Sequence, residues 1–273
     1  MVLPVGAGAG LVFFLRSAMP RRRPGVPHRQ LWAWTRDGVR IAVTHLPRRD
    51  GREAGAAMVL AHPAVTGQRY APLVGLAEEM ARSFDVFTFD FRGHGRSGGV
   101  LDLALGLEAP AADLEAVLGM VRERAYRWVG VAGFSLGGMA AFSLAAKRPR
   151  LMDALAVVGM PPRFPELKPY RGWLPLWFLL LRGLGARFRG SCIGGPAPVD
   201  LALAFPRDLP LLVVHGGREI FFPEEDLCRL MDLLGEKAEL LVVREAGHAE
   251  LGSGRERFID WFVERCEQAL GAR

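Results

Sequence analysis

The sequence has few cysteines and none of the patterns that a disulfide framework or a metal site needs. Its 273 residues include only three cysteines, Cys192, Cys228 and Cys266, which lie far apart in the chain. Their number is odd and no pair has the spacing of metal ligands. We therefore expect unpaired thiols in a reducing, cytoplasmic compartment and no metal. No dinucleotide site is implied, and no cofactor is expected.

The positive charge of the chain lacks the organisation that nucleic-acid binding requires. The formal net charge is +6, from 35 Lys and Arg against 29 Asp and Glu. The densest basic cluster is Arg21-Arg22-Arg23, and no stripe of basic residues with interleaved aromatic residues is present. A nucleic-acid partner is therefore not expected. The charge fits a solvated, arginine-rich surface or attraction to an anionic membrane surface.

The chain also lacks an apolar run that is long enough to cross a bilayer. The uncharged run at residues 3–15 is shorter than the ~20 apolar residues of a spanning helix. A secretory signal carries its positive charge before the apolar run, whereas Arg16 and Arg21 follow it here. Residues 1–29 are interpreted as an apolar and basic extension. Two alternatives stay open, namely peripheral membrane contact through residues 3–23 or packing of this extension on the domain.

Apolar strands and amphipathic helices alternate through residues 30–273, which we interpret as one domain. The Asp37-Gly38 pair between two alternating apolar runs predicts a β-hairpin over residues 31–45. Further strands are predicted at 57–61, 85–90, 127–132, 151–159, 210–215 and 238–243, and helices at 72–82, 109–124, 139–146, 224–234 and 255–270. This alternation predicts an α/β fold with a mostly parallel, doubly wound sheet of about eight strands and flanking helices.

One segment interrupts the alternation after the sixth strand. Residues 161–207 are rich in Pro, Trp and Leu, most densely between Trp173 and Leu181. Such an insertion is too long for an ordinary loop. We interpret it as a short helical cap over the carboxyl ends of the strands, where ligands bind in sheets of this kind. Its apolar side chains are either the core of the cap or a wall for a lipophilic substrate.

The most informative motif is Gly133-Phe134-Ser135-Leu136-Gly137, between a predicted strand and a predicted helix. A G-x-S-x-G sequence at a strand-turn-helix junction is typical of a nucleophile elbow, which exposes a serine hydroxyl on a strained turn. The alternative is a serine with a purely structural role in a tight turn. The strand before the motif and the helix after it favour the nucleophile.

The order of motifs resembles the α/β-hydrolase superfamily, in its serine hydrolase branch of esterases, lipases and thioesterases. The resemblance covers residues 30–270. It is carried by Asp90-Phe-Arg-Gly-His-Gly-Arg-Ser97, by the elbow, by His215-Gly-Gly-Arg-Glu219 and by Ala246-Gly-His248. It implies Ser135 as nucleophile, Glu219 as acid and His248 as base, in the chain order that this fold uses.

The resemblance also implies how these residues act. A serine hydroxyl needs a base within hydrogen-bond reach, which His248 would provide while Glu219 orients its imidazole. Nearby carboxylates are alternatives for the acid, namely Glu224, Glu225 and Asp226. The oxyanion donors would be the backbone N–H groups of Leu136 and Ala64, because Pro63 has none and Val65 is less well placed. Other polar residues are interpreted as structural braces of the strand ends, namely His62, Asp90, Arg92, His94 and His215.

These features predict a carboxylesterase-like serine hydrolase. We expect it to cleave a carboxylic ester or thioester of a small, lipophilic molecule through an acyl-enzyme intermediate. The residues expected to contact substrate are Val65, Phe134, Trp173, Trp177 and Phe221. Two alternatives stay open: a non-catalytic binding protein with this fold, and a serine-dependent acyltransferase or haloperoxidase-like enzyme.

Overall fold

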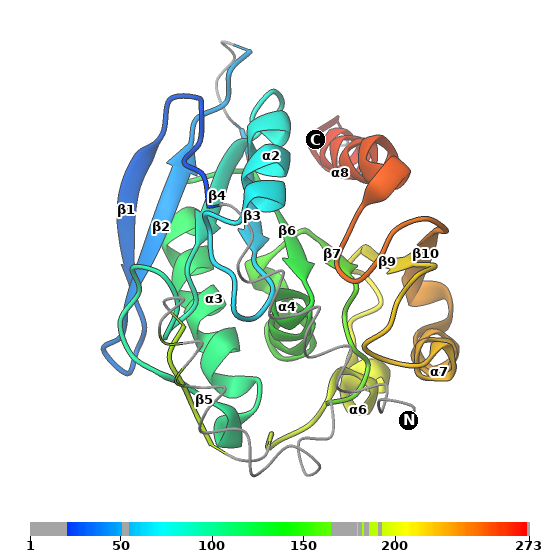
Figure 1. Ribbon diagram of the computed structural model, residues 1–273. Coiled ribbons are helices and arrows are strands. Elements are labelled where there is room, and N and C mark those ends of the chain that lie inside the picture. The colour runs from blue at the N-terminus through cyan, green and yellow to red at the C-terminus, as the bar shows by residue number, and fades with distance from the viewer. Residues whose placement is uncertain are drawn as a thin grey trace.

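An eight-stranded sheet forms the centre of the protein (Figure 1). The computed structural model describes residues 21–50, 55–164, 186–190 and 193–271, together with residues 179 and 182. The strands of the sheet are β1 (Arg29–Trp34), β2 (Arg40–Leu46), β3 (Ala56–Ala61), β4 (Asp85–Phe89), β6 (Trp128–Phe134), β7 (Ala154–Val158), β9 (Leu211–Gly216) and β10 (Ala238–Val243).

The order of strands in the sheet is β1-β2-β4-β3-β6-β7-β9-β10. The first two strands form the predicted antiparallel hairpin, in which Trp34 pairs with Arg40, and β2 pairs antiparallel with β4. All other neighbours in this sheet are parallel. The predicted mostly parallel sheet of about eight strands is therefore confirmed.

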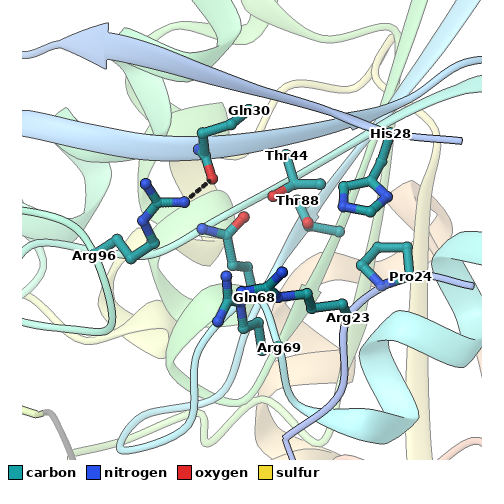
Figure 2. A pocket seen from close by; sticks show the side chains of 9 residues that line it. All are labelled: Arg23, Pro24, His28, Gln30, Thr44, Gln68, Arg69, Thr88 and Arg96. Atoms are coloured by element: carbon teal, nitrogen blue, oxygen red, sulfur yellow. Dashed lines mark hydrogen bonds between the residues drawn. The ribbon is translucent and has the colours of Figure 1, made fainter.

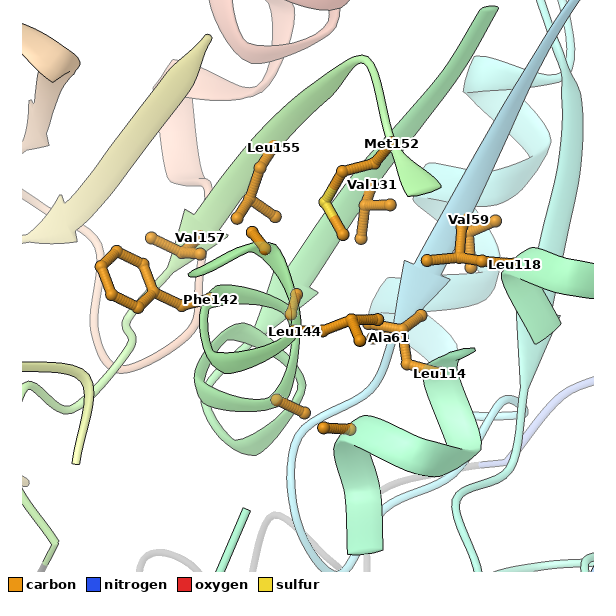
Figure 3. Close-up of a cluster of buried hydrophobic side chains, with 14 of the residues drawn as sticks. Val59, Ala61, Leu114, Leu118, Val131, Phe142, Leu144, Met152, Leu155 and Val157 are labelled. Atoms are coloured by element: carbon orange, nitrogen blue, oxygen red, sulfur yellow. The ribbon is translucent and has the colours of Figure 1, made fainter. Parts of the chain in front are cut away.

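Helices cover both faces of the sheet. Their bounds are α2 (Ala71–Met80), α3 (Glu108–Arg122), α4 (Leu136–Lys147), α6 (Pro198–Leu201), α7 (Glu224–Leu234) and α8 (Arg255–Gly271). One buried cluster joins α3, α4 and α7 to the sheet, and a second joins α2 and α8 to it. Figure 3 shows the part of the first cluster in which Leu114 and Phe142, from α3 and α4, face strand residues such as Val59. Within β3, Val59 and Ala61 belong to the first cluster and Met58 and Leu60 to the second. This alternation of side chains makes the sheet doubly wound, as predicted.

The junction between β6 and α4 is tighter than the sequence indicated. The strand runs to Phe134 and the helix begins at Leu136, so Ser135 is the single residue between them. The apolar pattern placed the strand end at Ala132 and the helix start at Met139, because the glycines between them carry no periodicity. The close packing of those glycines, described below, is what allows the helix to begin so early.

A short parallel pair that the sequence did not predict attaches the insertion to the domain. It joins β5 (Leu101–Asp102) to β8 (Phe188–Arg189), and Arg189 Nε donates a 2.7 Å hydrogen bond to Asp102 Oδ2. Part of the predicted cap at 161–207, including Trp173 and Trp177, lies outside the described residues. The described part of this segment contains the short helix α6. Its role as a cap and its contacts with substrate stay predictions.

The N-terminal extension is described from Arg21 onward, and residues 21–28 lie on the domain. Arg21 forms an isolated antiparallel bridge with Tyr70, and the Arg22 N–H donates to the carbonyl of Arg69 at 3.0 Å. In the part of the chain that the structure describes, no helix is long and apolar enough to cross a membrane. Membrane contact through residues 3–23 stays a prediction, because residues 1–20 lie outside that part.

Candidate active site

Ser135 occupies a strained backbone position at the carboxyl end of β6. Its φ is 50° and its ψ is −112°, a conformation that residues with a side chain rarely adopt. Such a conformation costs about 1–3 kcal/mol and persists only where the surroundings hold it. One such constraint is the hydrogen bond from the Ser135 N–H to the carbonyl of Val158, at 3.0 Å. The turn is therefore a nucleophile-elbow geometry, fixed by the neighbouring strand β7.

Two glycines make this turn sterically possible. A Cβ at Gly133 would collide with the carbonyl oxygen of Gly137, and a Cβ at Gly137 would collide with the carbonyl oxygen of Ala61. Both obstacles are backbone atoms, which cannot move aside as a flexible side chain would. The first turn of α4 therefore packs directly on the ends of β6 and β3, which brings the Ser135 backbone next to the loop after β3.

Gly137→Ala is expected to lower the free energy of unfolding by about 1–3 kcal/mol, because its methyl group would overlap the Ala61 backbone. Thermal and urea unfolding would measure the loss. Gly119→Ala is the matched control, since a Cβ at Gly119 in α3 meets no atom within 4 Å. That control should be neutral or more stable, because alanine favours helix. Equal stability of Gly137→Ala and the wild-type protein would contradict the proposed packing.

Ser135, His248 and Glu219 form one chain of hydrogen bonds. The distance from Ser135 Oγ to His248 Nε2 is 2.8 Å, and that from His248 Nδ1 to Glu219 Oε2 is 2.7 Å. An ionised carboxylate only accepts hydrogen bonds, so the neutral imidazole carries its proton on Nδ1. The Nε2 atom can then accept the Ser135 proton. The three residues follow β6, β9 and β10, and the parallel sheet brings the ends of these strands to one edge.

Glu219 is held as a carboxylate. Burial opposes its ionisation, but the hydrogen bond from His248 and those from the N–H groups of Ile220 and Phe221 outweigh that effect and lower the pKa of Glu219. Both backbone groups donate to Oε1 at 2.8 Å, which leaves Oε2 for the imidazole. A fixed negative charge therefore faces His248 and favours the imidazolium that forms when His248 takes a proton.

The other three carboxylates considered as the acid do not accept the 2.7 Å hydrogen bond from the His248 imidazole. Glu224 and Glu225 are exposed on the first turn of α7, and Asp226 accepts a hydrogen bond from Arg163 Nε at 2.9 Å. Of the four carboxylates considered from the sequence, the structure brings Glu219 to the imidazole.

The loop that carries His248 packs closely on the end of β7. The ring of Phe221 lies 4.2 Å from the imidazole, centroid to centroid. Gly159 has a φ of 55°, and a Cβ there would collide with the backbone nitrogen of Ala249. Sequence reasoning missed Gly159, although a glycine that ends a predicted strand is a signal for such a close approach. Phe221 was expected at the site and is found beside it.

Two buried histidines fix the loop after β3. His62 Nδ1 donates to the carbonyl of Pro63 at 2.7 Å, and His62 Nε2 accepts from the Phe91 N–H at 3.0 Å. His94 Nε2 accepts from the Val65 N–H at 3.2 Å. Burial lowers the pKa of both rings, that of His94 to about 3, so both are neutral near pH 7. Their contacts are those of structural braces.

The turn after β4 is braced in a similar way. The Asp90 carboxylate accepts hydrogen bonds from the Gln68 backbone N–H, from Gln68 Nε2 and from the Arg96 N–H, at 2.8 to 3.0 Å. Arg92 pairs with Asp113 at 2.8 Å. The side chain of His215 is buried at the end of β9 and lies 5.7 Å from the ring of Phe222, centroid to centroid.

The loop that is expected to supply an oxyanion donor lines a small cavity beside His248. Pro63, Ala64 and Val65 line it together with His248 and Ala249, and its volume of about 20 Å³ suits one water-sized group. The Val65 N–H is already engaged by His94, which favours Ala64 as the donor from this loop. Leu136 is the first residue of α4, where the backbone N–H has no partner within the helix.

A larger, mostly apolar cavity of about 340 Å³ adjoins this one. The two cavities share Pro63, Tyr70 and Ala249 in their walls. Leu73 and Leu76 of α2 also line the larger cavity, as do Leu251 and Phe134, which precedes the serine. Val65 and Phe134, both expected to contact substrate, therefore each border a cavity at this end of the sheet.

Comparison with known proteins gives one family match. The family described as serine aminopeptidase, S33, matches residues 52–190, about half of the chain. The chain is 30% identical over 122 residues to a pimeloyl-[acyl-carrier protein] methyl ester esterase of Aliivibrio fischeri, which covers 45% of this chain and 43% of that protein. It is 31% identical over 81 residues to an Agrobacterium fabrum protein named as a carbamate hydrolase, RutD, which covers 30% of each. The matches thus span less than half of these relatives.

Solved structures resemble the whole domain. The Pyrococcus furiosus esterase Pf2001 has a TM-score of 0.69 at 18% identity, with 91% of this chain and 96% of that chain covered. The α/β hydrolase GrgF of a Penicillium species has a TM-score of 0.70 at 15% identity, with 90% of this chain and 100% of that chain covered. Identity this low shows the fold alone. With the match over residues 52–190, it follows that the chain belongs to the serine aminopeptidase S33 family of α/β hydrolases.

Proposed function

We propose that this protein is a serine hydrolase that cleaves a carboxylic ester or thioester with a hydrophobic group. The observation that carries the proposal is the unbroken chain of hydrogen bonds from Glu219 through His248 to Ser135, with distances of 2.7 and 2.8 Å. A purely structural role for Ser135 would not require a strained turn. It would also not require a hydroxyl that is directed at the unprotonated nitrogen of a buried imidazole. The ester preference is supported by the relatives that are named as esterases.

The reaction proceeds in two halves. Ser135 Oγ attacks the carbonyl carbon while His248 Nε2 takes the hydroxyl proton, and Glu219 stabilises the resulting imidazolium. The N–H groups of Leu136 and Ala64 donate to the oxyanion. The C–O or C–S bond then breaks, and the leaving group takes the proton from His248. Water repeats the sequence on the acyl-enzyme, with His248 as base, and releases the acid and free Ser135.

Covalent labelling with a fluorophosphonate tests this proposal. We expect one adduct per chain by intact mass, located on the peptide that carries Ser135. The unlabelled protein should hydrolyse p-nitrophenyl esters and acyl-CoA thioesters. A leucine p-nitroanilide substrate tests for aminopeptidase activity, and added alcohols test for acyl transfer. A protein that neither labels nor cleaves any ester would support the non-catalytic alternative, and dominant transfer to alcohols would support an acyltransferase.

The apolar cavity next to the site predicts the dependence on acyl-chain length. Each methylene that enters it contributes about 0.8 kcal/mol, or about fourfold in kcat/KM, until the space of about 340 Å³ is filled. Leu73→Phe narrows this cavity and should move the optimum to shorter chains. Leu240→Phe, at a half-exposed position on β10, is the matched control and should leave it unchanged. A flat chain-length profile would contradict the assignment of this cavity.

The free thiols support a reducing location for this activity. Cys228 and Cys266 are both unpaired, the first exposed and the second buried. On this ground the proposed location is the cytoplasm.

A further inference from the structure

A third cavity, lined by polar side chains, lies at the other end of the loop after β3. It has a volume of about 210 Å³ and shares no lining residue with the two cavities near His248. Figure 2 shows the side chains of Arg23, Arg69 and Arg96 around it, with Thr44 and Thr88 from neighbouring strands. These three arginines are far apart in the sequence, and the fold brings them to one hollow.

The wall formed by residues 23–28 is fixed to the domain. The Arg22 N–H donates to the carbonyl of Arg69 at 3.0 Å, which places Arg23 next to Arg69. Glu78 of α2 also contacts this N-terminal segment. It pairs with the Arg22 side chain and accepts a hydrogen bond from the Gly25 N–H at 2.6 Å. Backbone pairing and an ion pair therefore fix the backbone of this wall, while the side chains of Arg23 and Arg96 are exposed to solvent.

Among the described residues that line this hollow, none carries a carboxylate. Glu78 is engaged by Arg22 and Gly25, and Asp90 by Gln68 and the Arg96 backbone. Arg96 is oriented by Gln30, whose Oε1 accepts from Nη1 at 2.8 Å. Three guanidinium groups therefore share one hollow with no counter-charge in its lining, an arrangement that favours a bound anion.

The floor adds neutral hydrogen-bonding groups. The side chains of Thr44 and Thr88 are buried in the sheet, and neither hydroxyl makes a hydrogen bond within the described residues. Gln68 Nε2 donates to Asp90 Oδ2 at 2.8 Å, which fixes the orientation of this amide on the same floor. Each threonine hydroxyl can donate to an anionic oxygen or accept from a ligand hydroxyl.

We propose that this hollow, named here the arginine pocket, binds the phosphate monoester group of a small molecule. Guanidinium groups match phosphate oxygens in pairs of parallel hydrogen bonds, and three of them exceed what the two oxygens of a carboxylate can use. The volume of about 210 Å³ leaves room beside the phosphate for a short polyol or similar polar group. Because Arg69 lies in the loop that also carries Ala64, an occupied pocket ties that loop to residues 23–28.

Calorimetric titration of the full chain tests this proposal with glycerol 3-phosphate and inorganic phosphate as probes and glycerol as the neutral comparison. We expect one glycerol 3-phosphate per chain, a thermal midpoint that rises with its concentration, and no binding of glycerol. Arg69→Gln and Arg96→Gln should each weaken binding at least about tenfold, because each removes a charge-assisted contact. Thr88→Val preserves every charge and should weaken it by a smaller factor.

Arg229→Gln is the matched control, because it removes the same charge from an exposed position on α7, at the opposite edge of the sheet. It should bind glycerol 3-phosphate as the wild-type protein does. An equal loss in Arg229→Gln, or no binding of either phosphate probe and of phosphatidic acid vesicles, would overturn the proposal. Vesicle binding that requires Arg69, without binding of free phosphates, would identify the same phosphate chemistry on a lipid headgroup.

Discussion

Ser135→Ala is expected to abolish fluorophosphonate labelling and to lower kcat/KM for esters by about four to six orders of magnitude. The variant removes the Ser135 Oγ atom, which lies 2.8 Å from His248 Nε2. Without it no acyl-enzyme forms, and only binding and the oxyanion donors can assist attack by water. Steady-state kinetics with purified protein and mass spectrometry after labelling measure both losses.

Ser143→Ala is the matched control for this prediction. Ser143 is a buried serine on the same helix, α4, and has no place in the proposed machinery. We expect this variant to label and to turn over as the wild-type protein does. Residual labelling of Ser135→Ala at the wild-type level would show that another nucleophile reacts, and the proposed chemistry would then fail. Because alanine keeps a Cβ at the strained position, unfolding experiments should find the variant folded.

The sequence predicted the architecture well because that architecture follows from local patterns. Asp37-Gly38 predicted the hairpin, and the helix predicted at 224–234 coincides with α7. The errors lie at boundaries that non-local packing decides. Leu136 begins α4 because the backbone of this turn packs on Ala61, which lies some seventy residues earlier in the sequence and is adjacent only in the sheet.

Features that depend on contacts between segments far apart in the sequence were harder to predict. The short pair β5 and β8 depends on a contact between the loop after β4 and the insertion, and neither segment has a strand-like pattern. The arginine pocket is a similar case. The sequence shows scattered arginines that are typical of a solvated surface, and only the fold places Arg23, Arg69 and Arg96 around one hollow.

The choice of the proposed acid shows what sequence reasoning could not decide within the candidate site. Glu219, Glu224, Glu225 and Asp226 lie within one turn and the start of a helix, and spacing alone leaves them as alternatives. The conformation of the loop after β9 distinguishes them. In this loop the N–H groups of Ile220 and Phe221 orient the Glu219 carboxylate toward His248. Helix α7 directs Glu224 and Glu225 into solvent.

Glu219→Gln is expected to lower kcat by about three to four orders of magnitude and to leave the fold intact. A neutral amide cannot stabilise the imidazolium that forms when His248 takes the serine proton. Its NH₂ group can also donate to Nδ1, which would move the imidazole proton to Nε2 and block acceptance from Ser135. Kinetics with the best ester substrate, together with circular dichroism and thermal unfolding, would separate loss of chemistry from loss of structure.

The neighbouring carboxylates provide the controls that make this result specific. Glu225→Gln removes an exposed charge, and Asp226→Asn removes the partner of Arg163 at 2.9 Å. Both should stay within about twofold of wild-type kcat, as is usual for surface substitutions. A loss in Asp226→Asn that equals the loss in Glu219→Gln would assign the acid to α7 in the active protein. A wild-type rate for Glu219→Gln would mean that the 2.7 Å contact with His248 only braces the loop.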